Sequence, residues 1–350
     1  TFERAPAFLI GKRGEGFRHM LTLMNGARLG VGFESLGLCE CAYRMAKAYA
    51  AERPSMGKTI DRHEMIADYL EEMRTDIQAI RALCMHGAWH EELAQKIELM
   101  LTIAQPEDEL EAKKLHRALK THKRKARRAT PLLKYFASEK AVEMARRNIQ
   151  IHGGNGYMKE YGAEKLLRDA LVMPIYEGTS QIQALMAMKD TLGGIMKNPQ
   201  GFVRRTAQAR WRALSARDPL ERRVAKIQQL SLSTQQHLIA KTAADKLRSV
   251  QSKPLAEWSQ AFLKDWNPKR DFAYAMLHAE RLCKLLTDEL VCELLLEQAQ
   301  KHPERRDVLE RYLERAEPRV RYLHDEITTT GQRLLRALAG VNRQDEQAAS

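Results

Sequence analysis

Glu177 is the residue whose setting in this sequence most strongly indicates chemistry. It is the one carboxylate in the segment Pro-Ile-Tyr-Glu-Gly-Thr-Ser-Gln-Ile-Gln, residues 174–183. Gly178 and Thr179 are typical of a loop that turns into a helix, with Thr179 or Ser180 as the N-cap. A carboxylate among apolar residues can serve as a general base, whereas a solvated acid ahead of a helix would explain the same letters. Local composition alone leaves both interpretations open.

A glycine-rich motif lies 27 residues before Glu177 and begins at Gln150, with the sequence Gln-Ile-His-Gly-Gly-Asn-Gly-Tyr. Two more motifs lie upstream: Met-Asn-Gly-Ala-Arg-Leu-Gly-Val-Gly at 24–32, and Tyr-Ala-Ala-Glu-Arg at 49–53 with Gly57 four residues on. Together they resemble the C-terminal half of the acyl-CoA dehydrogenase family, including the spacing between its flavin-contacting Gln and its catalytic Glu. Three ordered motifs make this resemblance specific.

The resemblance implies roles for individual residues. Glu177 would take the α-proton of an acyl-CoA thioester while the β-hydrogen leaves as hydride to FAD. Ala27 stands where some family branches carry their base, and an alanine cannot take a proton, so Glu177 keeps the role. The residues expected to bind the cofactor are Arg53, Gln150, Gly153, Gly154, Thr179 and Gln181, and those expected to bind the substrate are Arg28, Tyr176 and Gly178.

The same resemblance implies partners. In the family, the residues that match Arg53 and Gln150 reach the flavin of a neighbouring subunit, so we expect a homodimer or homotetramer. Arginine suits a pyrophosphate because its planar fork pairs with two oxygens at once. Electron-transfer flavoprotein is the expected electron acceptor, and the expected setting is the cytoplasm or, in a eukaryote, the mitochondrial matrix. The family's two preceding domains are absent from this sequence, so we expect the chain alone to hold FAD weakly and to be inactive.

The expected fold class is all-α, an up-and-down helical bundle of this family's C-terminal type followed by a helical extension. We expect the end of a central β-domain and a linker at 1–16, the bundle at 17–190, the extension at 191–343 and a loose tail at 344–350. Within the bundle, Pro131 is expected to open a helix over 132–150. Gly193-Gly194 and Asn198-Pro199 indicate a hinge at the start of the extension.

Charge and cysteine content limit the classes of partner. The net charge of +13 favours anionic partners but does not choose among CoA, nucleic acid and an anionic membrane surface. The five cysteines are an odd number and indicate free thiols rather than a disulfide framework. No His or Cys cluster has the spacing of a metal site, so we expect no metal. No apolar run is long enough to span a bilayer, which leaves only peripheral membrane contact open.

Two basic stretches, at 120–128 and 203–223, support a competing hypothesis. They could make the chain a non-catalytic binding or assembly protein on the same scaffold, for instance a DNA-associated branch. The stretch at 120–128 has no interleaved aromatic residues, however, and such runs are more often solvated helix faces. The presence of Glu177, Gln150 and Arg28 together argues for an enzyme, so we do not expect nucleic-acid binding.

Overall fold

The fold is all-α, as the sequence predicts, with one two-stranded hairpin. The structure, a computed structural model, describes residues 3–104, 106, 108–251 and 271–338. The expected tail at 344–350 lies outside the described residues. The first half comprises α1 (Gly16–Glu52), β1 (Pro54–Ser55), β2 (Lys58–Thr59), η1 (Ile60–Arg62), α2 (Glu64–Ile103), α3 (Glu109–His152), α4 (Gly154–Tyr157), η2 (Lys159–Tyr161) and α5 (Ala163–Ala170). The second half comprises α6 (Ser180–Lys197), α7 (Pro199–Ser215), α8 (Pro219–Gln251), α11 (Ala273–Leu277), α12 (Ala279–Lys301), η4 (Pro303–Arg305) and α13 (Arg306–Thr329).

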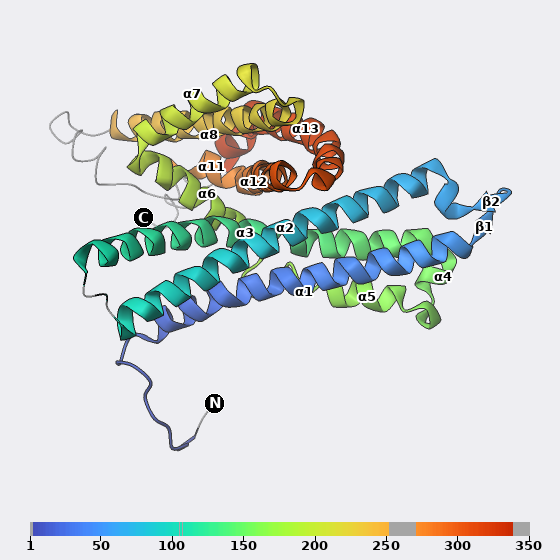
Figure 1. The fold of residues 1–350 in the computed structure, drawn as a ribbon, viewed down its shortest axis with the longest axis horizontal. Helices are drawn as coiled ribbons and strands as arrows, with labels where there is room; N and C mark the ends of the chain where they lie inside the picture. The colour runs from blue at the N-terminus through green and yellow to red at the C-terminus, as the bar shows by residue number, and fades with distance from the viewer. Residues whose placement is uncertain (1–2, 105, 107, 252–270, 339–350) are drawn as a thin grey trace.

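Three long helices form the bundle that positions the site. α1, α2 and α3 lie side by side in one layer, and α4 and α5 cover one end of it (Figure 1). Small buried residues allow this close approach: Ala42, Ala46 and Ala50 of α1 are fully buried. A Cβ at Gly32 would lie 2.7 Å from the Leu133 side chain, so glycine is what lets α1 and α3 meet there.

The α3 helix differs from the sequence prediction. It runs unbroken from Glu109 to His152, and Pro131 lies inside it rather than at its start. Proline removes one hydrogen bond and crowds the preceding turn, at a cost of about 3 kcal/mol. Buried residues on both sides, Ala129 before it and Leu132 after it, keep the two halves in one helix because each packs into the same core. Tertiary packing therefore overrides the local signal.

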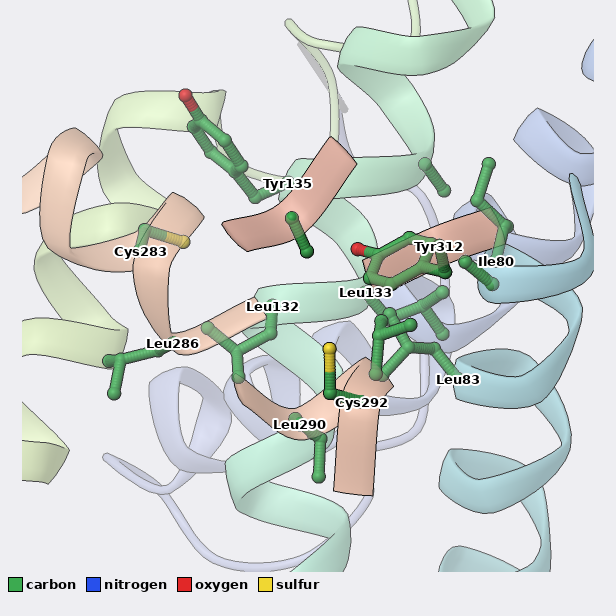
Figure 2. Close-up of a cluster of buried hydrophobic side chains, with 14 of the residues drawn as sticks. Ile80, Leu83, Leu132, Leu133, Tyr135, Cys283, Leu286, Leu290, Cys292 and Tyr312 are labelled. Atoms are coloured by element: carbon green, nitrogen blue, oxygen red, sulfur yellow. The ribbon is translucent and has the colours of Figure 1, made fainter. Parts of the chain in front are cut away.

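The helices after α6 pack onto the bundle as a second layer (Figure 1). Figure 2 shows where the layers join: Leu83 of α2 and Leu132 of α3 share one apolar cluster with Leu286 and Cys292 of α12 and Tyr312 of α13. All five side chains are buried. The extension and the bundle are therefore held by a continuous core.

The link between the layers lies slightly later than expected. α6 runs through Gly193 and Gly194 to Lys197, so the expected boundary at 190/191 falls within a helix. The chain turns at Asn198, whose side chain accepts a hydrogen bond of 2.9 Å from the Gly201 N–H and caps α7, with Pro199 in its first turn. The Asn-Pro half of the hinge prediction is correct and the Gly-Gly half is wrong, because burial of Leu192 keeps this part of α6 packed.

No helix in the described part of the chain combines the length and the apolar character that crossing a membrane requires.

Candidate active site

Glu177 lies in a short loop that joins α5 to α6. The Ser180 N–H closes the loop with a 2.9 Å hydrogen bond to the Pro174 carbonyl. Glu177 has φ +54° and Gly178 has φ +88°, both in the left-handed region. For a residue with a side chain this conformation costs about 1–2 kcal/mol, and it persists only where the surroundings enforce it. Such enforced strain is commonly found at functional sites.

The residues beside Glu177 fix where the loop ends. Thr179 is the N-cap of α6, and its hydroxyl accepts a 3.4 Å hydrogen bond from the Ile182 N–H, as one of the two alternatives predicted. The Ser180 hydroxyl donates to Glu139 of α3 at 2.5 Å. Glu177 itself is half-buried. The backbone of the loop is thus held by hydrogen bonds, while the Glu177 side chain stays partly exposed to solvent.

Arg28 of α1 contacts this loop, although it is 149 residues from Glu177 in the sequence. Its Nε donates to the Glu177 carbonyl oxygen at 3.2 Å, and the residue is only 5% exposed. Burial lowers the pKa of Arg28, and the negative charge of Glu177 partly opposes that effect. The structure thus brings together the two residues that the sequence assigns to base and substrate binding.

Tyr176 and Gly178 complete the part of the loop assigned to the substrate. The Tyr176 hydroxyl donates to the Glu34 carboxylate of α1, and burial and this contact raise the pKa of the phenol. A Cβ at Gly178 would lie 2.9 Å from Gln183 Nε2 and 3.6 Å from Arg28 Nη2. A side chain at position 178 would therefore displace the groups that hold the loop.

Gln181 points toward the extension. Its Nε2 donates to Glu280 of α12 at 3.1 Å, and the Tyr135 hydroxyl makes a weaker contact of 3.5 Å with the same carboxylate oxygen. The predicted contact of Gln181 with a cofactor stays a prediction.

The remaining expected cofactor residues form a separate exposed group at the far end of α1. Arg53 follows α1 directly and leads into the hairpin, where Ile60 N–H donates to its carbonyl at 2.9 Å. Gln150, Gly153 and Gly154 lie at the end of α3, and a Cβ on either glycine would meet none of the described residues within 4 Å. Arg53 makes no ion pair within the described residues. Within the described residues the side chains of Arg53 and Gln150 have no hydrogen-bond partner, whereas the Gly153 N–H donates to the Gln150 carbonyl at 3.1 Å.

Two contacts hold that end of the bundle together. Tyr49 stacks on His152 with ring centroids 4.2 Å apart, and its hydroxyl accepts a 3.0 Å hydrogen bond from Asn155 Nδ2. Met56 and Gly57 both have positive φ and form the tip of the hairpin, where Met56 is 93% exposed. Paired positive φ values are typical of tight hairpin turns. Arg53 thus sits at the base of a projecting, defined element.

The two groups are far apart on one rigid helix. Arg28 and Arg53 are separated by 25 residues of α1, and at 1.5 Å per residue this corresponds to about 37 Å. The Arg53 group therefore lies at one end of the bundle, whereas the Glu177 group lies along its length, beside Arg28 of α1 and Lys134 of α3. One chain cannot present both groups to the same small stretch of a ligand.

Two functional candidates escaped the sequence analysis. Gln183 is fully buried and its Nε2 donates to the Glu177 carbonyl at 3.3 Å and to the Gly178 carbonyl at 3.1 Å. Lys134 of α3 is also fully buried, donates to the Met173 carbonyl at 2.7 Å and has its pKa lowered to about 8 by burial. A lysine inside the apolar run Pro-Leu-Leu-Lys-Tyr-Phe was the signal that could have identified Lys134.

The geometry defines a site on an antiparallel helical bundle, in which a carboxylate on a loop lies beside a buried arginine. The family profile described as "Acyl-CoA dehydrogenase, C-terminal domain" matches residues 14–105 and 109–192. The chain therefore belongs to the acyl-CoA dehydrogenase family.

Individual relatives agree with this assignment. The chain is 36% identical over 193 residues to "Acyl-CoA dehydrogenase" of Bacillus subtilis, covering 55% of this chain and 43% of the relative. It is 34% identical over 190 residues to "Probable acyl-CoA dehydrogenase YngJ" of the same organism, covering 54% and 42%. The chain thus spans about two-fifths of the length of these curated relatives.

A solved structure shows the same fold beyond the matched bundle. An acyl-CoA dehydrogenase of Bacillus anthracis, determined in complex with FAD, superposes with a TM-score of 0.66 at 19% identity. The alignment covers 95% of this chain and 54% of that one. The arrangement of bundle and extension together is therefore shared with a known protein.

Proposed function

We propose that this chain forms the base-bearing part of an enzyme that removes hydrogens from the α and β carbons of an acyl-CoA thioester. The observation that carries the proposal is the strained loop, in which the half-buried Glu177 is held by its own carbonyl. Membership of the family supports the class of reaction.

The proposed role of Glu177 is general base. Its carboxylate takes the α-proton of the thioester, and the electron pair left on the α-carbon conjugates with the carbonyl. Its backbone N–H donates to no acceptor within the described residues. That N–H can donate to the thioester oxygen and stabilise the charge that develops there.

FAD is the proposed cofactor, and the exposed residues fit it. Arg53 makes no ion pair within the described residues and lies beside a projecting hairpin, and no side chain covers the exposed backbone at Gly153 and Gly154, so a phosphate can approach it closely. Gln150 lies at the same end of the bundle. When bound, FAD supplies the acceptor for the β-hydrogen, which leaves as hydride.

The separation along α1 supports a shared site. Because Arg53 lies about 37 Å along α1 from Arg28, we infer that Arg53, together with Gln150 at the same end of the bundle, serves the cofactor bound next to another subunit's Glu177. A shared site requires at least a dimer, and by resemblance to the family we propose a homodimer or homotetramer. Electron-transfer flavoprotein is the proposed acceptor of the electrons, by resemblance to the family.

The competing hypothesis of a nucleic-acid-binding scaffold has less support. Two cations of the stretch at 120–128 form surface ion pairs with other helices: Lys123 with Glu98 at 2.6 Å, and Arg127 with Asp190 at 2.7 Å. Paired side chains are less available to neutralise phosphates. The second basic stretch behaves similarly, since Arg223 makes two hydrogen bonds to Glu317.

Turnover of acyl-CoA by the protein in its full natural length tests the proposal. Incubation with saturated acyl-CoA thioesters of several chain lengths and an artificial electron acceptor should yield the corresponding 2-enoyl-CoA, detected by mass spectrometry. Failure to form any enoyl-CoA with a protein that contains stoichiometric FAD would contradict it.

A further inference from the structure

Gln183 makes an arrangement of hydrogen bonds that no role assigned so far explains. It lies in the first turn of α6, is fully buried, and bridges the carbonyls of Glu177 and Gly178 with one amide nitrogen. These are the two consecutive residues that have positive φ. The amide therefore holds the strained backbone directly.

The orientation of the amide is fixed by its partners. In the described residues Gln183 Oε1 has no hydrogen-bond donor. A buried acceptor without a donor costs about 1–3 kcal/mol. The reverse orientation would place that oxygen against two carbonyl oxygens, and their repulsion would destabilise the loop further. The amide is therefore oriented with its N–H group toward the loop.

Other helices hold the same loop at further points. Arg28 of α1 adds a second donor to the Glu177 carbonyl, and Lys134 of α3 holds the Met173 carbonyl near the start of the loop. Gly178 leaves room for the bridge, since a Cβ there would lie 2.9 Å from Gln183 Nε2. All of these contacts act on backbone carbonyls, so they set the direction of the peptides.

We propose that Gln183 is the positioning residue for Glu177: by bridging the carbonyls of Glu177 and Gly178 it keeps the loop left-handed and leaves the Glu177 N–H and carboxylate directed to the substrate. This inference rests on the proposed function. Gln183 acts only through the loop and does not take part in the chemistry.

Replacing Gln183 by Met removes the donor at nearly constant length. The matched control is Gln208→Met, the same change at an exposed position of α7. We expect Gln183→Met to lower kcat about 10²-fold, the effect of misplacing a catalytic group by about 1 Å, with a smaller change in the affinity for acyl-CoA. A variant with the kcat of the wild type would overturn the proposal.

Amide hydrogen exchange gives a second readout that does not require catalysis. The Ser180 N–H, bonded to the Pro174 carbonyl across the loop, should exchange at least 10-fold faster in Gln183→Met and unchanged in the control. Unchanged exchange at Ser180 would count against the bridge. Should the Met variant not fold, Gln183→Asn, which retracts the amide by one methylene, should show the same two effects.

The two proposals fail in different ways. A wild-type protein without dehydrogenase activity would remove the proposed function, while exchange at Ser180 would still decide whether Gln183 holds the loop. An active wild type with an equally active Gln183→Met variant would remove only the positioning role.

Discussion

Mixed dimers test whether the two groups of site residues belong to different active sites. One chain carries Arg53→Ala and keeps Glu177, and the other carries Glu177→Gln and keeps Arg53. Each homodimer has one lesion in every site and should be nearly inactive. In a mixed dimer, the intact Glu177 of the first chain is served by the intact Arg53 of the second, so one of its two sites is complete.

The separation of about 37 Å between Arg28 and Arg53 along α1 is the reason to assign the two groups to different subunits. The activity that mixing should recover follows from the two-fold symmetry of a dimer. Random pairing of equal amounts of the two chains gives mixed dimers in about half of the population. One site in two is then complete, so the mixture should recover about one quarter of the wild-type activity. If both residues served the same cofactor in one chain, every site would still contain a lesion and nothing would be recovered.

The assay uses the full natural length of the protein, with the two chains carrying different affinity tags and co-expressed. Two successive affinity steps isolate the mixed dimer, whose activity per subunit should be about half that of the wild type. The matched control pairs Arg53→Ala with a wild-type chain in the same way. A purified mixed dimer no more active than either parent would refute the assignment of the two groups to two subunits.

Two further predictions concern stability. The buried Asp288 accepts hydrogen bonds from Tyr312 at 2.7 Å and from the partly exposed Arg319 at 2.8 and 2.6 Å. Asp288→Ala should therefore lower the free energy of unfolding by about 3 kcal/mol, the low end of the cost of breaking a buried ion pair. Urea denaturation measures this, Asp288→Asn should lose less, and a loss below about 1 kcal/mol would contradict the structure. Lys134 has its pKa lowered to about 8, below the value near 10.4 of an unfolded chain, so between these values the unfolded chain binds more protons. The stability of the wild type relative to Lys134→Met should therefore rise as the pH increases from 8 to 10, and a difference that stays constant or falls would contradict the burial of that ammonium.

Much of the bundle could be predicted because its signals are local. The bundle was expected to begin at residue 17, and its first helix, α1, begins at Gly16, one residue earlier. Thr179 caps α6 because a threonine before an apolar helix can accept its first free N–H group. Pro131 misled the prediction because its helix-breaking effect is local, whereas the core that holds α3 together on both sides of it is not.

The site was predicted only in part for the same reason. Family motifs placed Glu177 and Arg28 in one site, but the hydrogen bond between them joins residues 149 positions apart and depends on how α1 meets the loop. Gln183 could not be found from the sequence, since a glutamine in the first turn of a helix is usually solvated. Its role depends on the positive φ of two preceding residues, which only the backbone reveals.

Exchange of the substrate α-proton by Glu177→Gln is the most direct test of Glu177 as the base. The amide keeps the size of the side chain, so folding, FAD content and acyl-CoA binding should be unchanged, while exchange with deuterated solvent and turnover should both fall by about 10⁴-fold or more, at the upper end of general-base catalysis. Because an amide does not ionise, no pH at which the protein is stable should restore activity. A Glu177→Gln variant that exchanges and turns over at nearly the wild-type rate, or one that only loses FAD or stability, would contradict the role of Glu177.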